Sequence, residues 1–252
     1  MSRPEAIPAA TLIVLADRAE GTEVLMVERT AAMVFAAEAA VFPGGRVDPD
    51  DRVLGARIAP SLEPDDAAAR IAAIRETLEE TGLAIGFDAP ATELLEARAA
   101  LSAGRTFSAL AADAGWRIDL AALTPWSRWE PPGGEGLSRR FDTRFYLAAA
   151  PSALPPLSAD GAENHRLFWA TATEVLARAD AGALALIFPT RRNLERLAQF
   201  ARFAEADAHA RALAARKIVP WVEWTDGAAH LCIPADRGYP ITREPLDTSR
   251  RG

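Results

Sequence analysis

The chain has 252 residues, of which 50% are apolar and 25% are charged, a composition typical of a globular protein with a buried core. Its 28 basic and 35 acidic residues give a formal net charge of −7, which argues against a nucleic-acid-binding protein, because such proteins usually present a basic face. The only cysteine, Cys232, excludes a disulfide within one chain, and no apolar run is long enough to span a bilayer. We therefore expect no nucleic-acid or membrane partner and a cytoplasmic location.

The first apolar segment, residues 7–16, has two interpretations. Arg3 precedes it and it is rich in alanine, as in a weak signal peptide. Pro8 interrupts the segment, however, and Asp17 follows it directly, which favours a first β-strand over residues 11–16.

Two more short strands are predicted before the first helix. Residues 23–28 are apolar or β-branched, and the turn-like segment before them predicts a hairpin with the first strand. Residues 39–42 predict a third strand that ends at Pro43-Gly44-Gly45, where glycines allow the backbone to approach a ligand closely. The polar, acidic stretch 46–64 predicts a loop.

A strong helix is predicted over residues 67–81. This segment lacks glycine and proline, and its apolar residues recur at helical spacing. Asp65 or Asp66 is suited to cap its start, and Gly82 is suited to end it in the left-handed conformation.

The remaining segments alternate between helical and extended patterns. The predicted helices cover residues 91–103, 106–114, 173–179 and 190–215, the last as one or two helices. The predicted strands cover residues 120–129, 141–150, 167–170, 218–224 and 228–233, the last two joined by a turn at Asp226-Gly227. The pattern predicts a single α/β or α+β domain over residues 7–240, with a helical insertion near 88–118 and a tail at 241–252.

Three glutamates lie on one turn of the helix predicted over residues 67–81. Glu76, Glu79 and Glu80 are spaced i, i+3 and i+4, so they share one face. Their mutual repulsion and the negative end of the helix dipole destabilise this arrangement unless a cation binds. Mg²⁺ (or Mn²⁺) fits this need, and Arg75 is spaced to pair with Glu79. The alternative interpretation is a solvated acidic face.

These residues resemble the signature of the Nudix hydrolase family, G-x5-E-x7-R-E-U-x-E-E-x-G-U, in which U is a bulky aliphatic residue. The matching positions are Gly45, Arg75, Glu76, Glu79, Glu80, Gly82 and Leu83. Arg75 follows Gly45 by 30 positions instead of 14, so the loop is longer by 16 residues. Thr77 replaces an aliphatic residue, and the early glutamate has no clean match, although Asp48, Asp50 and Asp51 are candidates for its place.

The resemblance implies an α/β/α sandwich around a mixed sheet and hydrolysis of a nucleoside diphosphate linked to another moiety. It implies that Glu76, Glu79, Glu80 and Gly45 hold the metal, and that Gly44 lines the same site. Glu79, Glu80 and Arg75 belong to the implied catalytic set. Glu163 is the candidate general base, because many relatives carry a functional glutamate in a comparable loop. The alternative for Glu163 is an ordinary loop glutamate.

Further motifs resemble the coenzyme A and acyl-coenzyme A diphosphatases of the family. Arg29 and Phe42-Pro43-Gly44-Gly45 have the spacing of R-(S/A)-x3-R-x3-G-x3-F-P-G-G, although Val34 and Glu38 replace its second arginine and its glycine. Residues 139–145 and 188–190 are similar to a subgroup with a lengthened Nudix loop. Arg29, Gly44 and Arg144 are therefore predicted to bind substrate.

Other residues have open roles. Four more arginines are candidates for phosphate contacts, with surface charge balance as the alternative: Arg139, Arg140, Arg191 and Arg192. Three tryptophans are candidates to cover an acyl or pantetheine arm, with simple core packing as the alternative: Trp116, Trp126 and Trp129.

The leading hypothesis is a Mg²⁺-dependent coenzyme A or acyl-coenzyme A diphosphatase with a small-molecule nucleoside diphosphate substrate. A homodimer is a possible assembly. The first alternative is a pyrophosphohydrolase of ADP-ribose, dinucleotides or nucleoside triphosphates. The second is a catalytically silent Nudix-like module that binds a nucleotide, which has no need of three clustered glutamates.

Overall fold

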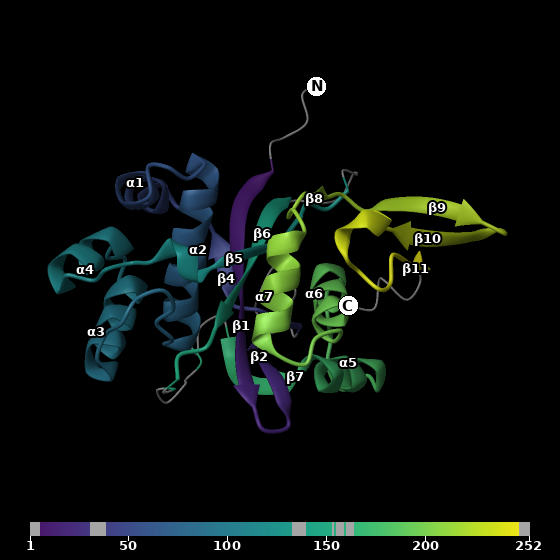
Figure 1. The fold of residues 1–252 in the computed structure, drawn as a ribbon, viewed down its shortest axis with the longest axis horizontal. Helices are drawn as coiled ribbons and strands as arrows, with labels where there is room; N and C mark the ends of the chain where they lie inside the picture. The colour runs from purple at the N-terminus through teal and green to yellow at the C-terminus, as the bar shows by residue number, and fades with distance from the viewer. Residues whose placement is uncertain are drawn as a thin grey trace.

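A mixed β-sheet forms the centre of the molecule. The computed structural model describes residues 6–30, 39–132, 140–152, 154, 159 and 164–246. The strand order of the eight-stranded sheet is β3-β2-β1-β6-β5-β8, while β4 pairs with β1 and β7 pairs with β2. Helices α1 to α4 lie on one side of this sheet and α5 to α7 on the other (Figure 1). The predicted α/β/α sandwich around a mixed sheet is therefore confirmed.

The strands of the central sheet are β1 (Ile7–Arg18), β2 (Gly21–Arg29), β3 (Ala40–Val41), β4 (Gly44–Arg46), β5 (Thr124–Trp129), β6 (Phe141–Ala149), β7 (Asn164–Thr171) and β8 (Lys217–Ile218). Strand β1 runs antiparallel to β2 and β4 and parallel to β6. Alternate side chains of β1 point to opposite faces, so Leu12 and Val14 enter one apolar core while Ile13 and Leu15 enter the other.

The α-helices are α1 (Pro49–Ile58), α2 (Pro64–Thr81), α3 (Ala91–Ser102), α4 (Phe107–Ala114), α5 (Ala172–Asp180), α6 (Phe188–Leu197) and α7 (Phe203–Ala212). Helix α2 lies directly against β1 and β4, and its Ile71 and Ile74 are fully buried in the first core. Helices α5, α6 and α7 supply Val175, Leu194 and Ala206 to the second core. The 190–215 stretch is therefore two helices, and α3 and α4 lie within the predicted insertion.

A small second sheet lies near the C-terminus (Figure 1), with the order β11-β10-β9. It contains β9 (Trp221–Thr225), β10 (Ala228–Cys232) and β11 (Arg243–Pro245), so part of the predicted tail pairs with β10. Asp226 and Gly227 both have positive φ, at 52° and 80°, as a two-residue hairpin turn requires. The predicted turn is confirmed.

The structure corrects the sequence interpretation in the lengthened loop. Residues 46–64 were predicted as a loop, but they contain the ten-residue helix α1. Pro49 occupies its first turn, and Asp48 and Asp51 form a capping box whose carboxylates accept backbone N–H groups at the start of the helix. Gly55 lets α1 lie close to α2, because a Cβ there would be 2.9 Å from the carbonyl carbon of Ala67.

The start of α2 also differs from the prediction. Neither Asp65 nor Asp66 caps the helix; Glu63 does, and its carboxylate accepts the N–H groups of both residues. Pro64 causes the earlier start, since its fixed φ suits the first helical position and it has no N–H to satisfy. Gly82 ends the helix with φ 78°, as predicted. Within the described ranges, no helix has the length and apolar character needed to cross a membrane.

Candidate active site

The candidate site lies where the second half of α2 passes over the glycine pair of β4. The N–H of Gly44 donates to Oε2 of Glu80 at 2.9 Å. A Cβ on Gly45 would lie 2.4 Å from Oε1 of Glu76, so only glycine allows this carboxylate to rest on the strand. A Cβ on Gly44 would lie 2.4 Å from the carbonyl oxygen of Ala10 in β1. The structure thus brings Gly44 and Gly45 together with two glutamates of the signature.

Arg75 holds two of the acidic side chains in place through hydrogen bonds. Its Nε and Nη2 donate to the two carboxylate oxygens of Asp51 at 3.0 and 2.9 Å, and its Nη1 donates to Glu76 at 2.8 Å. Nη2 also donates to the carbonyl of Arg46, which fixes the end of β4. The expected partner Glu79 is more distant, with 3.8 Å between Nη1 and Oε2. The predicted i,i+4 pair of Arg75 with Glu79 is therefore present, but the hydrogen bonds of Arg75 go to Asp51 and Glu76.

Asp51 is the acid that the lengthened loop contributes. It is fully buried, and burial raises its pKa despite the hydrogen bond and charge of Arg75. Burial alone would lower the pKa of Arg75, but the hydrogen bond to Asp51 and the charge of Glu76 raise it above its ordinary value. Of the three aspartates considered for the early glutamate, Asp48 stays 3.6 Å from Arg75 and Asp50 accepts the N–H of Ser108. Of the three, Asp51 makes the bidentate hydrogen bonds to Arg75 and Asp48 adds a longer ion pair.

Two carboxyl groups in this site are shielded from water: Glu80 is buried, and Glu76 is partly buried beside Arg75, with 17% of its side chain exposed. Burial raises the pKa of Glu76 to about 7, although Arg75 acts against the shift. Burial, followed by the charge of Glu76, raises the pKa of Glu80 to about 8. These shifts mean that a positive charge placed between them would be favourable.

The donor set fits a hard divalent cation in its chemistry. Carboxylate oxygens are preferred ligands of Mg²⁺, and the backbone of Gly45 lies beside Glu76. Glu79 is the most accessible of the three glutamates, with 32% of its side chain exposed. In the described part of the chain, no three Asp, Glu, His or Cys side chains already converge as a metal cage. We conclude that Glu76 and Glu80 form the buried part of the site and Glu79 its accessible part.

Strands β2 and β7 complete the surroundings of Glu80. Asn164 is fully buried, and its Nδ2 donates to Oε1 of Glu80 at 3.2 Å. Arg29 pairs with Asn164 across the two strands, and its positive charge acts to lower the raised pKa of Glu80. The predicted substrate residue Arg29 therefore lies beside the glutamates. Asn164 was missed, because only the pairing of β2 with β7 brings it there.

A residue of the predicted insertion holds the end of the glutamate helix. Arg98 of α3 donates from Nε to the carbonyl of Glu79 at 2.6 Å and from Nη2 to that of Glu80 at 2.9 Å. The last carbonyls of a helix have no partner within it, and a cation there also offsets the helix dipole. Sequence reasoning missed Arg98, since no local pattern marks this contact.

Arg144, a predicted substrate residue, lies near the start of α2 and away from the glutamates. Its guanidinium contacts Glu63 at 3.1 Å and Asp66 at 3.4 Å, at the start of α2. Asp66 and Glu80 are separated by roughly 20 Å along the helix axis, from the rise per residue. The structure therefore does not bring Arg144 to the glutamates. Glu163, the predicted general base, lies outside the described residues, as does Arg139.

Other candidates for substrate contacts belong to the core or to ion pairs. Arg192 is buried and contacts Glu195 and Glu244, while Arg191 contacts Asp180. Two tryptophans are buried in the second core, which confirms the core interpretation for Trp126 and Trp129. Trp116 stacks on Phe87 with 4.5 Å between ring centroids, at the edge of the first core.

Comparison with known proteins identifies the family of the chain. The family model described as the NUDT19 Nudix domain matches residues 55–197, more than half of the chain. Proteins named acyl-coenzyme A diphosphatase NUDT19 from Gallus gallus and Homo sapiens are 28% and 29% identical, and the alignments cover 86% and 88% of this chain and 73% of each relative. A crystal structure of a NUDIX hydrolase from Alicyclobacillus acidocaldarius is 29% identical, with a TM-score of 0.67 over 82% of this chain and 97% of that one. The chain therefore belongs to the NUDT19 Nudix domain family, and it is a Nudix hydrolase.

Proposed function

We propose that this hydrolase is a metal-dependent acyl-coenzyme A diphosphatase. It would cleave the diphosphate of coenzyme A or acyl-coenzyme A to adenosine 3′,5′-bisphosphate and the corresponding phosphopantetheine. The observation that carries the proposal is the buried pair Glu76 and Glu80, held against Gly44-Gly45 with raised pKa values. The matched relatives named acyl-coenzyme A diphosphatase support the choice of substrate.

In this mechanism one group of residues would hold the metal, and other residues keep that group in position. Glu76, Glu79, Glu80 and the backbone of Gly45 would hold Mg²⁺ or Mn²⁺. Such an ion neutralises diphosphate oxygens and lowers the pKa of bound water. Arg75 keeps Glu76 turned toward β4, while Gly44 and Asn164 each fix one oxygen of Glu80. The preorganised carboxylates therefore need little rearrangement during the reaction.

Arg29 and Glu163 are assigned to the substrate and to the water. The guanidinium of Arg29, which lies near Glu80, is suited to contact a phosphate oxygen of the substrate. Glu163 remains the predicted general base. It precedes Asn164, whose side chain reaches Glu80, so its place in the chain is consistent with that role.

Product analysis of a small substrate panel tests the proposal. Coenzyme A, a short-chain and a long-chain acyl-coenzyme A, ADP-ribose and NADH would each be incubated with Mg²⁺, Mn²⁺ or EDTA and separated by chromatography. We expect adenosine 3′,5′-bisphosphate from the coenzyme A compounds, and no release in EDTA. Cleavage of ADP-ribose while coenzyme A stays intact would favour the alternative pyrophosphohydrolase. No metal-dependent release from any compound would favour the silent module.

Cytoplasmic location, a homodimer and the lack of a nucleic-acid partner remain predictions from the sequence. Size-exclusion chromatography with light scattering tests the homodimer. Fractionation of cells that express the full chain tests the location.

A further inference from the structure

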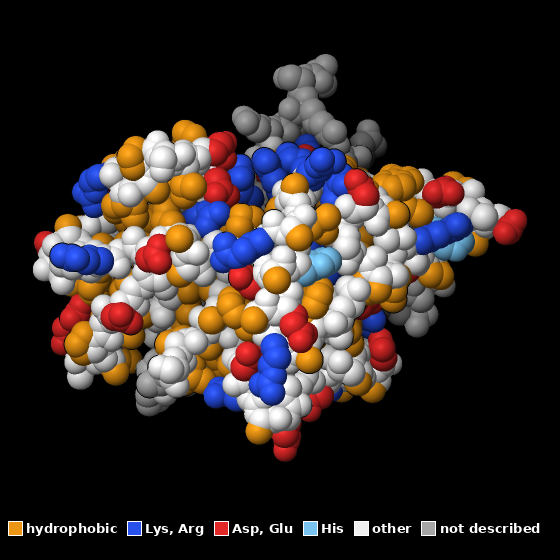
Figure 2. Space-filling model, in the orientation of Figure 1, with side chains coloured by type: hydrophobic (Ala, Val, Ile, Leu, Met, Phe, Trp, Pro, Cys, Tyr) orange, Lys and Arg blue, Asp and Glu red, His pale blue; other side chains and the backbone are white. Residues whose placement is uncertain are grey.

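Basic side chains gather on one surface of this acidic chain. Figure 2 shows a cluster of Lys and Arg side chains between α1 and β8, although the whole chain has a net charge of −7. Beneath this surface lies a cavity of about 430 Å³, a size within the usual range for small-molecule sites. Its wall contains five cationic side chains and three carboxylates: Arg52, Arg128, Arg140, Arg144, Lys217, Asp65, Glu130 and Asp142.

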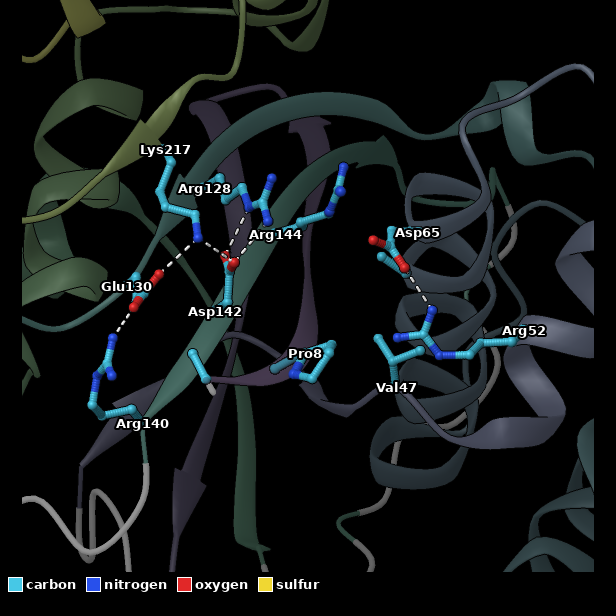
Figure 3. Close-up of a pocket in the computed structure, with 13 residues that line it drawn as sticks. Pro8, Val47, Arg52, Asp65, Arg128, Glu130, Arg140, Asp142, Arg144 and Lys217 are labelled. Carbon is cyan, nitrogen blue, oxygen red and sulfur yellow. Dashed lines mark hydrogen bonds and ion pairs between the residues drawn. The ribbon is translucent and has the colours of Figure 1, made fainter. Parts of the chain in front are cut away.

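The basic cavity, defined by these residues, is distinct from the glutamate site. Asp65 and Ala69 in the first half of α2 line it, whereas Glu76 and Glu80 lie in the second half. Ala69 and Glu76 are about 10 Å apart along the helix, from the rise per residue. Figure 3 shows Arg52 and Asp65 on one side of the cavity and Lys217, Glu130 and Arg140 on the other.

On the β-sheet side, three cations share two carboxylates. Asp142 accepts Nε and Nη2 of Arg128 at 2.7 Å each and also contacts Nζ of Lys217 at 2.6 Å. Glu130 accepts Nζ of Lys217 at 2.7 Å and also contacts Arg140. These two carboxylates are largely buried, with 12% and 13% of their side chains exposed, so they stay fixed between the cations. Among the described residues, three cations thus lie around two carboxylates.

Further donors remain for a ligand. In its contacts with described residues, Arg128 donates from Nε and Nη2 only, and Arg52 donates from Nη1 only, to Asp65. A guanidinium has five N–H donors, and its planar fork matches the oxygens of a phosphate. An anion with several oxygens is the ligand that such a group of side chains recognises best.

The rest of the lining is apolar. The parts of the wall without charge are Ala6, Pro8 and Ala9 at the start of the chain, and Val47 and Ala69. The cavity is larger than a phosphate ion alone would need, so a carbon skeleton can lie against these side chains while its anionic group faces the cations.

We propose that the basic cavity is a second ligand site, which binds the phosphate group of a small phosphomonoester. This proposal does not depend on the proposed function. The phosphate group could belong to inorganic phosphate or to an organic phosphomonoester, such as a product of coenzyme A cleavage. The test distinguishes these two ligands.

Binding to the full-length chain in EDTA tests this site without the metal centre. Isothermal titration at constant ionic strength would compare inorganic phosphate, adenosine 3′,5′-bisphosphate and phosphopantetheine with chloride. Without metal, no cation is present to bridge these ligands to the glutamates. We expect at least one of the three to bind the wild-type chain in the millimolar range or tighter. Tighter binding of the organic compounds identifies a phosphomonoester site, and equal binding of all three identifies a phosphate site.

Substitutions that remove a cation or a carboxylate from the cavity test whether the ligand binds there. Arg52→Gln and Lys217→Met each remove a donor, and we expect each to weaken binding about tenfold, the effect of one charged hydrogen bond. Asp65→Asn removes the carboxylate that pairs with Arg52, and we expect equal or tighter binding. Arg105→Gln is the matched control, because Arg105 is also about half exposed and paired with an exposed aspartate, Asp113.

Three results would overturn the proposal. The first is no binding of any of the three compounds beyond that of chloride. The second is an equal loss in Arg105→Gln and Arg52→Gln, which would indicate nonspecific attraction to surface charge. The third is unchanged affinity in both Arg52→Gln and Lys217→Met. Turnover is not measured in these experiments, so their failure leaves the proposed function untouched.

Discussion

The two halves of α2 face surroundings of different charge. Its second half buries Glu76 and Glu80 with raised pKa values, while Arg75 is largely occupied by Asp51. Its first half faces the basic cavity, where cations outnumber carboxylates. The raised pKa values favour a cation beside the glutamates, and the guanidinium donors that remain in the basic cavity favour an anion there. A single helix can thus present two sites with different ligands, and changes to each half should have separate effects.

Glu80→Gln should have the largest effect. The amide can still accept the N–H of Gly44, but it removes the charge and the metal-ligand oxygen. We expect kcat to fall by about 10³-fold or more, since charge neutralisation and water activation both depend on the metal. Steady-state kinetics with coenzyme A measures this, and Glu79→Gln should behave similarly.

The matched control for this substitution is Glu96→Gln, at an exposed position of α3. It should keep wild-type turnover, and binding of phosphate compounds in the basic cavity should be unchanged in Glu80→Gln. Near-wild-type kcat in both Glu79→Gln and Glu80→Gln would disprove the assignment of the site.

Asp51→Ala should mainly affect folding. It leaves the guanidinium of Arg75 buried without its bidentate partner, and breaking a buried ion pair in this way typically costs about 3–5 kcal/mol. Urea unfolding in EDTA measures the change in the free energy of unfolding. Asp113→Ala, at an exposed ion pair, should cost less than about 1 kcal/mol. Equal costs in the two variants would show that Arg75 does not depend on Asp51.

The stability of the metal-free protein should fall as pH rises. The pKa values of Glu76 and Glu80 are about 7 and about 8 in the folded chain, above their ordinary value of 4.5. The folded state therefore binds more protons than the unfolded state between these limits, so the free energy of unfolding decreases from about pH 5 to about pH 8.

Thermal unfolding in EDTA across this pH window measures the decrease. Mg²⁺ should reduce it, because the ion replaces the protons as the favourable partner of the carboxylates. The double variant Glu76→Gln and Glu80→Gln should lose most of the pH dependence. A melting temperature that rises with pH in the wild-type chain without metal would contradict the raised pKa values.

The sequence predicted those features of the site that depend on the local spacing of residues. The helix and the common face of Glu76, Glu79 and Glu80 follow from the i, i+3, i+4 pattern, and the end at Gly82 follows from backbone preference. The position of Gly44-Gly45 beside them required the resemblance to a family. These features form the centre of the candidate site.

Features that depend on tertiary packing were not predicted. The polar composition of residues 46–64 hid α1, whose capping box selects Asp51 over Asp48 and Asp50. Local spacing correctly placed Glu79 beside Arg75, but it could not reveal the hydrogen bonds of Arg75 to a buried aspartate 24 positions away. Asn164 and Arg98 approach α2 from β7 and α3, and no local pattern marks such contacts.

Arg98→Met should have the smallest effect, and its sign depends on two opposing contributions. Loss of a positive charge near the glutamates would by itself favour a bound cation, by about 0.3–1 kcal/mol at an accessible helix end. Loss of two hydrogen bonds to the carbonyls of Glu79 and Glu80 loosens the last turn, and hydrogen bonds to charged groups contribute about 1.5–3 kcal/mol each.

We expect the second contribution to dominate. Only part of the energy of these two hydrogen bonds acts on the metal, so the Mn²⁺ concentration for half-maximal activity should rise about fivefold in Arg98→Met, which corresponds to about 1 kcal/mol of metal affinity. Arg98→Lys should recover part of this loss, because an ammonium group can still donate to one carbonyl. Arg105→Gln, in the same insertion, should leave the metal dependence unchanged. A lower Mn²⁺ requirement in Arg98→Met would mean that charge, and not the positioning of the last turn, is what α3 contributes to the glutamate site.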